Sequence, residues 1–132
     1  MKIIVGTVIK EGDKILMVKE ARKEFYGKWS FPAGHLEFNE DIFEGAIRET
    51  LEETGHKVML TRMLPIQIIQ IQGELIYKFM FLANIIQKNV KPIVKDEILE
   101  AKFISMEEIK KNKEQLRYPE QNLKLLEYTS FC

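Results

Sequence analysis

The chain has 132 residues, 45% of them hydrophobic, and its 20 Lys and Arg residues balance 20 Asp and Glu residues. This length suits one domain with a substantial core, so we expect residues 1–132 to form a single domain. The zero net charge gives no global field that would favour nucleic acid or an anionic membrane surface as a partner. The only cysteine, Cys132, excludes an internal disulfide, and no apolar run is long enough to cross a bilayer, which favours a cytoplasmic protein.

The first predicted elements are two strands in a hairpin. Residues 2–9 are rich in β-branched side chains, residues 11–13 suit a turn, and residues 14–19 form the returning strand. A charged loop over 21–28 follows. Beyond residue 56 we expect two long strands over 57–72 and 74–87 joined at Gly73, a short strand over 101–104, and helices over 106–111 and 119–128. This mixture indicates an α+β fold or a layered α/β/α sandwich.

Between these strands the sequence predicts a helix that ends at Gly55. Asn39 is a suitable N-cap, and the acids Glu40 and Asp41 suit the positive end of the helix dipole. Gly55 can adopt the left-handed conformation that closes a helix.

An acidic cluster lies on one face of this helix. Residues three and four positions apart are neighbours on a helix, so Glu49, Glu52 and Glu53 must converge, next to Arg48. Converging carboxylates repel one another unless a cation lies among them, and oxygen ligands suit Mg²⁺ or Mn²⁺. The alternative is a solvated Glu-rich face. The absence of lysine among these acids favours the metal site.

The spacing of this cluster resembles the signature of the Nudix hydrolases, G-x5-E-x7-R-E-U-x-E-E-x-G-U, where U is usually a bulky apolar residue. The matching residues are Gly34, Glu40, Arg48, Glu49, Glu52, Glu53 and Gly55. Thr50 and His56 depart from the signature, both at U positions. The resemblance implies an α/β fold, a Nudix-type α/β/α sandwich with a mixed β-sheet between helices.

The resemblance also implies roles for the matching residues. The metal ligands would be Gly34, through its carbonyl, together with Glu49, Glu52 and Glu53. Arg48 is expected to orient Glu40 or Glu49 by a charge-assisted hydrogen bond. The general base varies across the family. The candidates are Glu49 and two glutamates of a later loop, Glu97 and Glu100, for which a simple solvating role is an even alternative. The catalytic set is therefore Arg48, Glu49, Glu53, Glu97 and Glu100.

Residues near the signature are candidates for binding substrate. Arg22 and Lys28 could receive the outer phosphates, Trp29 could stack on a base, and His35 could donate to a phosphate. Glu37 is the best additional acid because it shares a loop with Gly34. For each of these side chains a structural or solvated role is the alternative.

The expected activity is Mg²⁺-dependent hydrolysis, with Mn²⁺ as a substitute ion, of a phosphoanhydride in a nucleoside di- or triphosphate or a similar small organic pyrophosphate. The string from Phe31 to Glu37, FPAGHLE, is similar to a subgroup of broad phosphatases that also takes the pyrophosphorylated pyrimidine precursor of thiamin, and to nucleotide-sanitising members. The alternatives are a pyrophosphohydrolase acting on dinucleotides or RNA caps, and a non-catalytic module that binds a nucleotide or a protein. Nudix enzymes are often dimers, so a homodimer is compatible with the resemblance.

Overall fold

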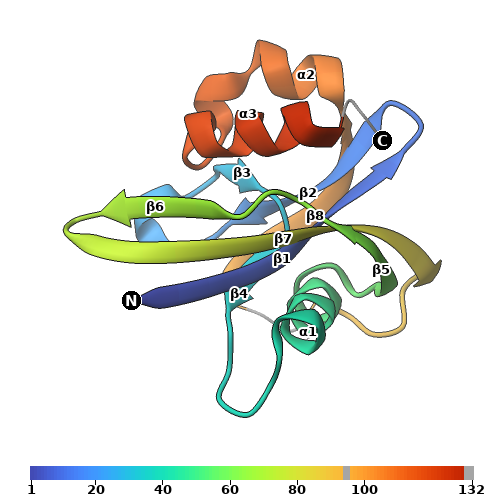
Figure 1. The fold of residues 1–132 in the computed structure, drawn as a ribbon. Helices are drawn as coiled ribbons and strands as arrows, with labels where there is room; N and C mark the ends of the chain where they lie inside the picture. Colours follow the sequence, from blue (N-terminus) through green and yellow to red (C-terminus); the bar gives the residue numbers. More distant parts are fainter. Residues whose placement is uncertain (94–95, 130–132) are drawn as a thin grey trace.

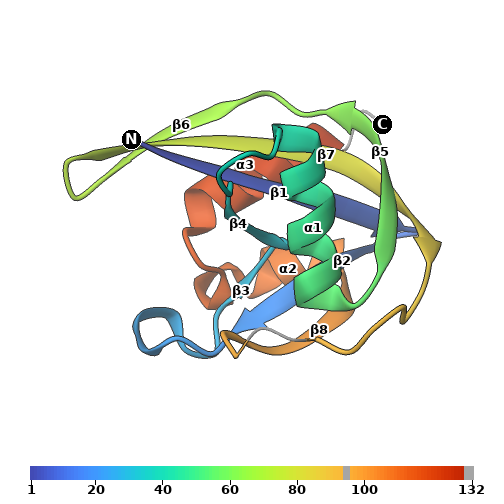
Figure 2. The same cartoon turned by 90° about the horizontal axis from the view of Figure 1, so that it is seen from below.

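The computed structural model describes residues 1–93 and 96–129, so Cys132 lies outside the described residues. The described chain forms an eight-stranded mixed sheet between helices. Helix α1 (Ile42–Thr54) covers one face, and α2 (Met106–Lys111) and α3 (Pro119–Tyr128) cover the other (Figures 1 and 2). The expectation of an α/β/α sandwich is confirmed.

Strand β1 (Lys2–Glu11) lies at the centre of the sheet. It pairs in parallel with β7 (Glu74–Gln87) and antiparallel with the three-residue strand β4 (Ala33–His35). It also forms the expected hairpin with β2 (Lys14–Glu20). Strand β2 continues the sheet through β3 (Trp29–Ser30) and β8 (Ile98–Ser105). The two short strands β3 and β4, which the sequence pattern did not predict, fix the loop that precedes α1.

The expected long strand over residues 57–72 is wrong. It is divided into β5 (Lys57–Met63) and β6 (Gln67–Ile71), and both pair antiparallel with the 14-residue β7. The break falls at Leu64 to Ile66. Pro65 has no N–H to donate to a ladder, and Leu64 instead turns into the core, where it is 2% exposed and its N–H donates to the carbonyl of Met80.

Successive residues of β1 face opposite sides of the sheet, as the pleat requires. Val5 packs with Ala46 of α1 and with Phe81 of β7. Val8 belongs instead to the larger core beneath α2 and α3, together with Met80. Odd-numbered residues of β1 therefore face α1, and even-numbered residues face α3.

The capping of α1 corrects one expectation. Asp41, and not Asn39, is the N-cap: its carboxylate accepts from the Glu44 N–H, and the Glu44 carboxylate accepts from the Asp41 N–H. This reciprocal capping box satisfies two donors, whereas Asn39 lies earlier in the loop with φ 69°. Gly55 closes the helix in the left-handed conformation, as expected, with φ 80°.

Thr50 occupies a position of the signature that is usually apolar, and the structure explains why a hydroxyl is tolerated there. Its Oγ1 is buried and donates to the carbonyl of Ala46 at 2.8 Å. The same oxygen lies 2.7 Å from Oγ1 of Thr7 on β1. Because the Thr50 proton is used within the helix, Thr7 is the donor to Thr50, and both hydroxyls are satisfied.

The two helices on the other face begin in different ways. Ser105 caps α2 as expected, by accepting from the Glu108 N–H at 3.1 Å. Helix α3 has no side-chain cap, and Tyr118, the residue before it, holds a left-handed conformation with φ 46°. A bulky residue rarely adopts this conformation, so the surroundings must hold it there.

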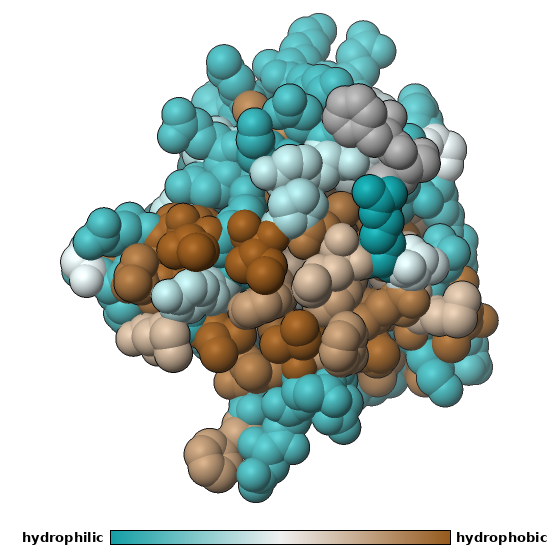
Figure 3. Space-filling view, in the orientation of Figure 1, coloured by the Kyte–Doolittle hydropathy of each residue, from teal (hydrophilic) through white to brown (hydrophobic). Residues whose placement is uncertain are grey.

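The surface carries apolar side chains over β5, β6 and β7 (Figure 3). They include Met59, Met63, Ile66, Ile68 and Leu75, each more than 40% exposed. In the described residues no helix is long and apolar enough to cross a membrane.

Candidate active site

Two glutamates of α1 are enclosed against strand β4. Glu49 and Glu53 are only 2% and 4% exposed, although the sequence placed them on an acidic face away from the apolar one. Oε1 of Glu53 accepts from the Ala33 N–H at 3.1 Å. A Cβ built on Gly34 would lie 1.8 Å from Oε2 of Glu49, so only glycine leaves room for this carboxylate.

Arg48 lies at the centre of the acidic residues. Its guanidinium binds Glu40 through two hydrogen bonds, from Nε at 2.9 Å and from Nη2 at 2.7 Å. Nη1 lies 3.1 Å from Glu52, 3.4 Å from Glu37 and 3.6 Å from Glu49. Arg48 is therefore surrounded by four carboxylates.

The same guanidinium also fixes the strand beside it. Nη2 of Arg48 donates to the carbonyl of His35 at 3.1 Å. Hydrogen bonding to Glu40 raises the pKa of Arg48 above its ordinary value, and the same bonds lower the pKa of the Glu40 carboxyl. Arg48 therefore stays charged and ties the helix to the loop and to β4.

A second charged group, not predicted from the sequence, lies beside this site. Glu20 ends β2 and is 4% exposed, with Arg22 bound closely to Oε1 and Arg117 Nη1 3.7 Å from Oε2. Hydrogen bonding to Glu20 raises the pKa of Arg22, and the charges of Glu97 and Glu53 add to this effect. Arg22 thus lies within the field of Glu53. The only sequence signal for Glu20 was an acid at the end of β2, separated from its apolar run by Lys19.

The two later glutamates proposed as general bases have different partners. Glu97 lies near Arg22, and its carbonyl accepts from the Ala21 N–H at 2.6 Å. Glu100 pairs instead with Lys19 at 3.8 Å on the neighbouring strand.

The remaining candidates differ in their distance from the acids. Lys28 donates to the carbonyl of Glu114 at 2.5 Å, towards α2 and α3. Trp29 packs on the core beneath these helices, with the ammonium groups of Lys19 and Lys102 5.7 and 5.2 Å from its ring centre. Only His35 and Glu37 adjoin the Arg48 cluster, and both are exposed.

The His56 imidazole, the other departure from the signature, supports the backbone. Its Nδ1 accepts from the Asn89 N–H at 3.1 Å, and burial, followed by the charge of Lys88, lowers its pKa.

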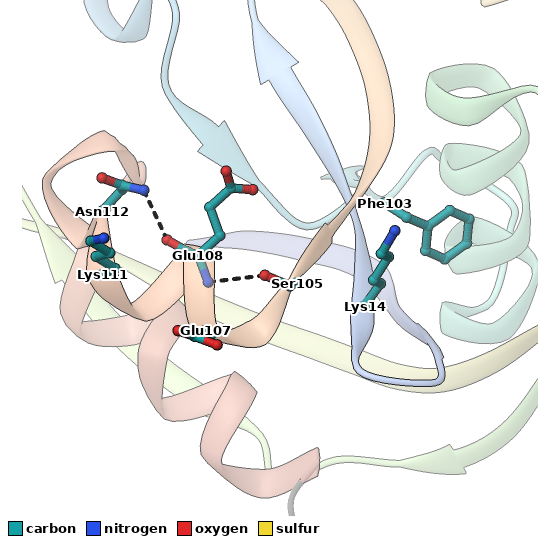
Figure 4. Close-up of a pocket in the computed structure, with 7 residues that line it drawn as sticks. All are labelled: Lys14, Phe103, Ser105, Glu107, Glu108, Lys111 and Asn112. Atoms are coloured by element: carbon teal, nitrogen blue, oxygen red, sulfur yellow. Dashed lines mark hydrogen bonds between the residues drawn. The ribbon is translucent and has the colours of Figure 1, made fainter.

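A surface cavity of about 460 Å³ shares no residue with the acidic cluster. It lies at the start of α2, where Glu108 donates its N–H to Ser105 and accepts from Asn112 (Figure 4). Its polar groups therefore cap the helix. A smaller cavity of about 150 Å³ is lined by Trp29, Lys102 and residues of α2 and the segment after it.

The donors of the acidic cluster fit a hard divalent cation by their chemistry. Four carboxylates around one guanidinium leave an excess of negative charge, and Glu53 adds to it. Among the residues that the structure describes, however, no three acidic, histidine or cysteine side chains are placed to form a ready-made metal cage. The carboxylates would have to turn towards the ion as it binds.

Comparison with known proteins agrees with this geometry. The NUDIX domain model matches residues 2–125. A nudix hydrolase of Caenorhabditis elegans is 37% identical over 109 residues, which cover 81% of this chain and 29% of that protein. The 8-oxo-dGDP phosphatase NUDT18 of Danio rerio is 42% identical over 82 residues, covering 61% of this chain and 24% of that protein. The chain thus spans less than a third of the length of these relatives.

A solved structure of a NUDIX hydrolase from Nitrosomonas europaea superimposes with a TM-score of 0.91 and 28% identity. The match covers 98% of this chain and 88% of that one. The architecture, including the sheet and both helical layers, is therefore shared along nearly the whole chain.

Proposed function

This chain belongs to the Nudix hydrolase family, and from that premise we propose that it hydrolyses a phosphoanhydride in a nucleoside di- or triphosphate or a similar small organic pyrophosphate, with Mg²⁺ or Mn²⁺. The observation that carries this proposal is Arg48 within its four carboxylates, beside a glycine that admits Glu49. Relatives named 8-oxo-dGDP phosphatase and ADP-ribose pyrophosphatase support a small nucleotide as substrate.

Glu49, Glu52 and Glu53, with the carbonyl of Gly34, would hold the ion. A divalent cation supplies charge neutralisation for the phosphates and lowers the pKa of a water molecule. Arg48 holds Glu40 and the carbonyl of His35, and so fixes β4 against α1. Arg22, held by Glu20 and within the field of Glu53, would receive a phosphate oxygen.

The general base is proposed to be Glu49 or Glu97. Glu49 is enclosed beside Gly34, and Glu97 lies on the loop next to Arg22. Glu100 is the weaker candidate because Lys19 holds it on β8. The balanced charge supports a small substrate over a long RNA. The complete set of signature glutamates supports an enzyme over a binding module.

A homodimer and a cytoplasmic location stay predictions. The exposed apolar side chains over β5, β6 and β7 offer a surface on which a second copy could dock (Figure 3).

The test is a ³¹P NMR time course on nucleoside di- and triphosphates, ADP-ribose, a dinucleotide and the thiamin pyrimidine pyrophosphate, with and without Mg²⁺ or Mn²⁺. Glu53→Gln keeps an acceptor for the Ala33 N–H, so it should fold but lose most of the turnover. Glu127→Gln, exposed on α3, is the matched control and should retain full activity. Metal-dependent hydrolysis by Glu53→Gln at the wild-type rate would contradict the metal assignment.

A further inference from the structure

A small cavity lies between β3, β8, α2 and the segment that follows α2, and it shares no residue with the acidic cluster. Its volume is about 150 Å³. Trp29 and three buried apolar side chains, Ile104, Ile109 and Leu116, line it and are here called its floor. The three apolar residues are 8%, 4% and 4% exposed, so water reaches little of their surface. A ligand seated here would therefore lie on apolar side chains.

The exposed residues that line the cavity are polar and are here called its rim. They are Lys102, Glu108, Asn112 and Gln115. The Asn112 amide donates to the backbone carbonyl of Glu108 at 3.1 Å, which fixes one side of the rim (Figure 4). An apolar floor with a few polar groups at its edge is the usual composition of a small-molecule site.

Backbone hydrogen bonds hold the walls of the cavity in place. The N–H of Arg117 donates to the carbonyl of Trp29 at 2.8 Å, and Leu116 forms a parallel bridge with Trp29. In the segment after α2, the N–H of Gln115 donates to the carbonyl of Asn112 at 2.9 Å. The cavity is thus formed before a ligand arrives, which lowers the entropic cost of binding.

Two ammonium groups lie close to the indole ring of Trp29. Nζ of Lys19 and Nζ of Lys102 are 5.7 and 5.2 Å from the ring centre. Lys19 also pairs with Glu100 at 3.8 Å, whereas Lys102 has no carboxylate partner in the described part of the chain. The charge of Lys102 can therefore bind an anionic group of a ligand whose ring lies against the indole.

The size of the cavity limits the ligand to a single ring. The volume of about 150 Å³ is close to that of an apolar protein cavity that holds one benzene molecule. Pockets for drug-sized ligands are larger, at roughly 300 Å³ or more. A whole nucleotide is therefore too large for this cavity, and a ring with one small substituent fits it.

We propose that this cavity is an accessory binding site for a small aromatic carboxylate, with its ring on the floor beside Trp29 and its carboxylate on Lys102. Trp29 then contacts a planar ring that is not part of the substrate. Because the cavity and the acidic cluster have no residue in common, this inference does not depend on the proposed function.

The experiment uses the only tryptophan of the chain as its reporter. Trp29 supplies the single indole N–H resonance of a ¹H–¹⁵N spectrum, so its shift reports directly on the cavity. The probes are benzoate, benzyl alcohol and benzylamine, which share a ring and differ in charge. The variants are Lys102→Met, which keeps an unbranched stem without the charge, and Lys110→Met. Lys110 is an exposed residue of α2 that does not line the cavity, and it is the matched control.

We expect benzoate to shift the Trp29 resonance to saturation with a Kd of about 1 mM or lower. Benzyl alcohol should bind roughly 10-fold more weakly, and benzylamine should not reach saturation because its ammonium would lie beside Lys102. Lys102→Met should weaken benzoate roughly 10-fold and leave the affinity for benzyl alcohol unchanged. Lys110→Met should bind all three probes as the wild type does.

Three results would overturn the inference. They are no saturable shift with benzoate, equal affinity for benzoate in the wild type and Lys102→Met, and tighter binding of benzylamine than of benzoate. Equal losses for benzoate and benzyl alcohol in Lys102→Met would also contradict it, because the lysine would then only shape the cavity. Lys102 is exposed, so the variant should fold, and urea unfolding checks this. If it does not fold, Lys102→Gln replaces it with the same expected loss.

Discussion

The carboxylate of Glu49 occupies the space that any side chain at residue 34 would need. The clash at 1.8 Å involves the end of a glutamate side chain and not the backbone, so an added methyl group would displace Glu49 more readily than it would move β4. The glycine of the signature is therefore explained by a contact across 15 positions of the chain.

Gly34→Ala should accordingly remove most of the metal-dependent turnover, with a smaller effect on stability. The matched control is Gly12→Ala, at a turn with no neighbouring atom within 4 Å but with φ 63°. That variant should lose about 1 kcal/mol of unfolding free energy and retain its activity. Initial rates and urea unfolding on both variants check the prediction; wild-type turnover by Gly34→Ala would contradict it.

The buried hydroxyl pair of Thr7 and Thr50 predicts an asymmetric mutant cycle. Thr7→Val leaves the Thr50 proton bonded to Ala46, whereas Thr50→Val leaves the Thr7 hydroxyl without its acceptor. Thr50→Val should therefore cost about 1–3 kcal/mol, and Thr7→Val less. The double variant should be no less stable than Thr50→Val alone. Denaturant unfolding of the three variants gives the answer, and additive losses would show that the pair is not coupled.

Acid should weaken the Arg48–Glu40 contact. The pKa of Glu40 is lower in the folded chain than in the unfolded chain, because Arg48 donates to its charged form. Its contribution to stability is present above the unfolded pKa of about 4.3 and is lost as the pH falls through the lower folded value. Glu40→Gln should be less stable than the wild type at pH 7, and this difference should shrink below pH 4. The urea midpoint against pH measures this, with Glu127→Gln as the control that should show no such convergence.

Lys78 should shift stability with pH in the same direction as Glu40, but in an alkaline window. Its pKa of about 8 lies below the value of about 10.4 for an unfolded lysine, so the unfolded chain binds more protons between these values. Its contribution to the free energy of unfolding should rise from pH 8 to pH 10, and Lys78→Met should remove that rise. Thermal midpoints across this range, compared with Lys88→Met, would show it; parallel curves for wild type and Lys78→Met would contradict the burial of this ammonium.

Local sequence patterns were sufficient to predict much of the fold. The hairpin at residue 12, the closure of α1 at Gly55 and the cap of α2 at Ser105 depend on neighbours within a few positions, and the sequence predicted them. The N-cap at Asp41 was missed because Asn39 and Asp41 are both good caps, and only the reciprocal bond with Glu44 decides between them.

Several contacts around the site could not be predicted from the sequence because they join residues far apart in the chain. Spacing along one helix brings Arg48 to Glu49 and Glu52, and the family signature brings Glu40 to them. No local pattern links Glu20 to Arg117, which are 97 positions apart, or Lys78 to Asn122, 44 apart. These pairs depend on how the start of α3 and the residues before it pack on β2 and β7, which no local pattern specifies.

Because successive side chains of β1 face opposite sides of the sheet, neighbouring residues of this strand contact different layers of the fold. Val5 supports the helix that carries the acids, and Ile4, next to it, faces the other side of the sheet, where it is aligned with Lys78. Substitution at Ile4 would therefore leave the packing of Val5 against α1 unchanged, so one face of the strand can vary without disturbing the helix that carries the acids.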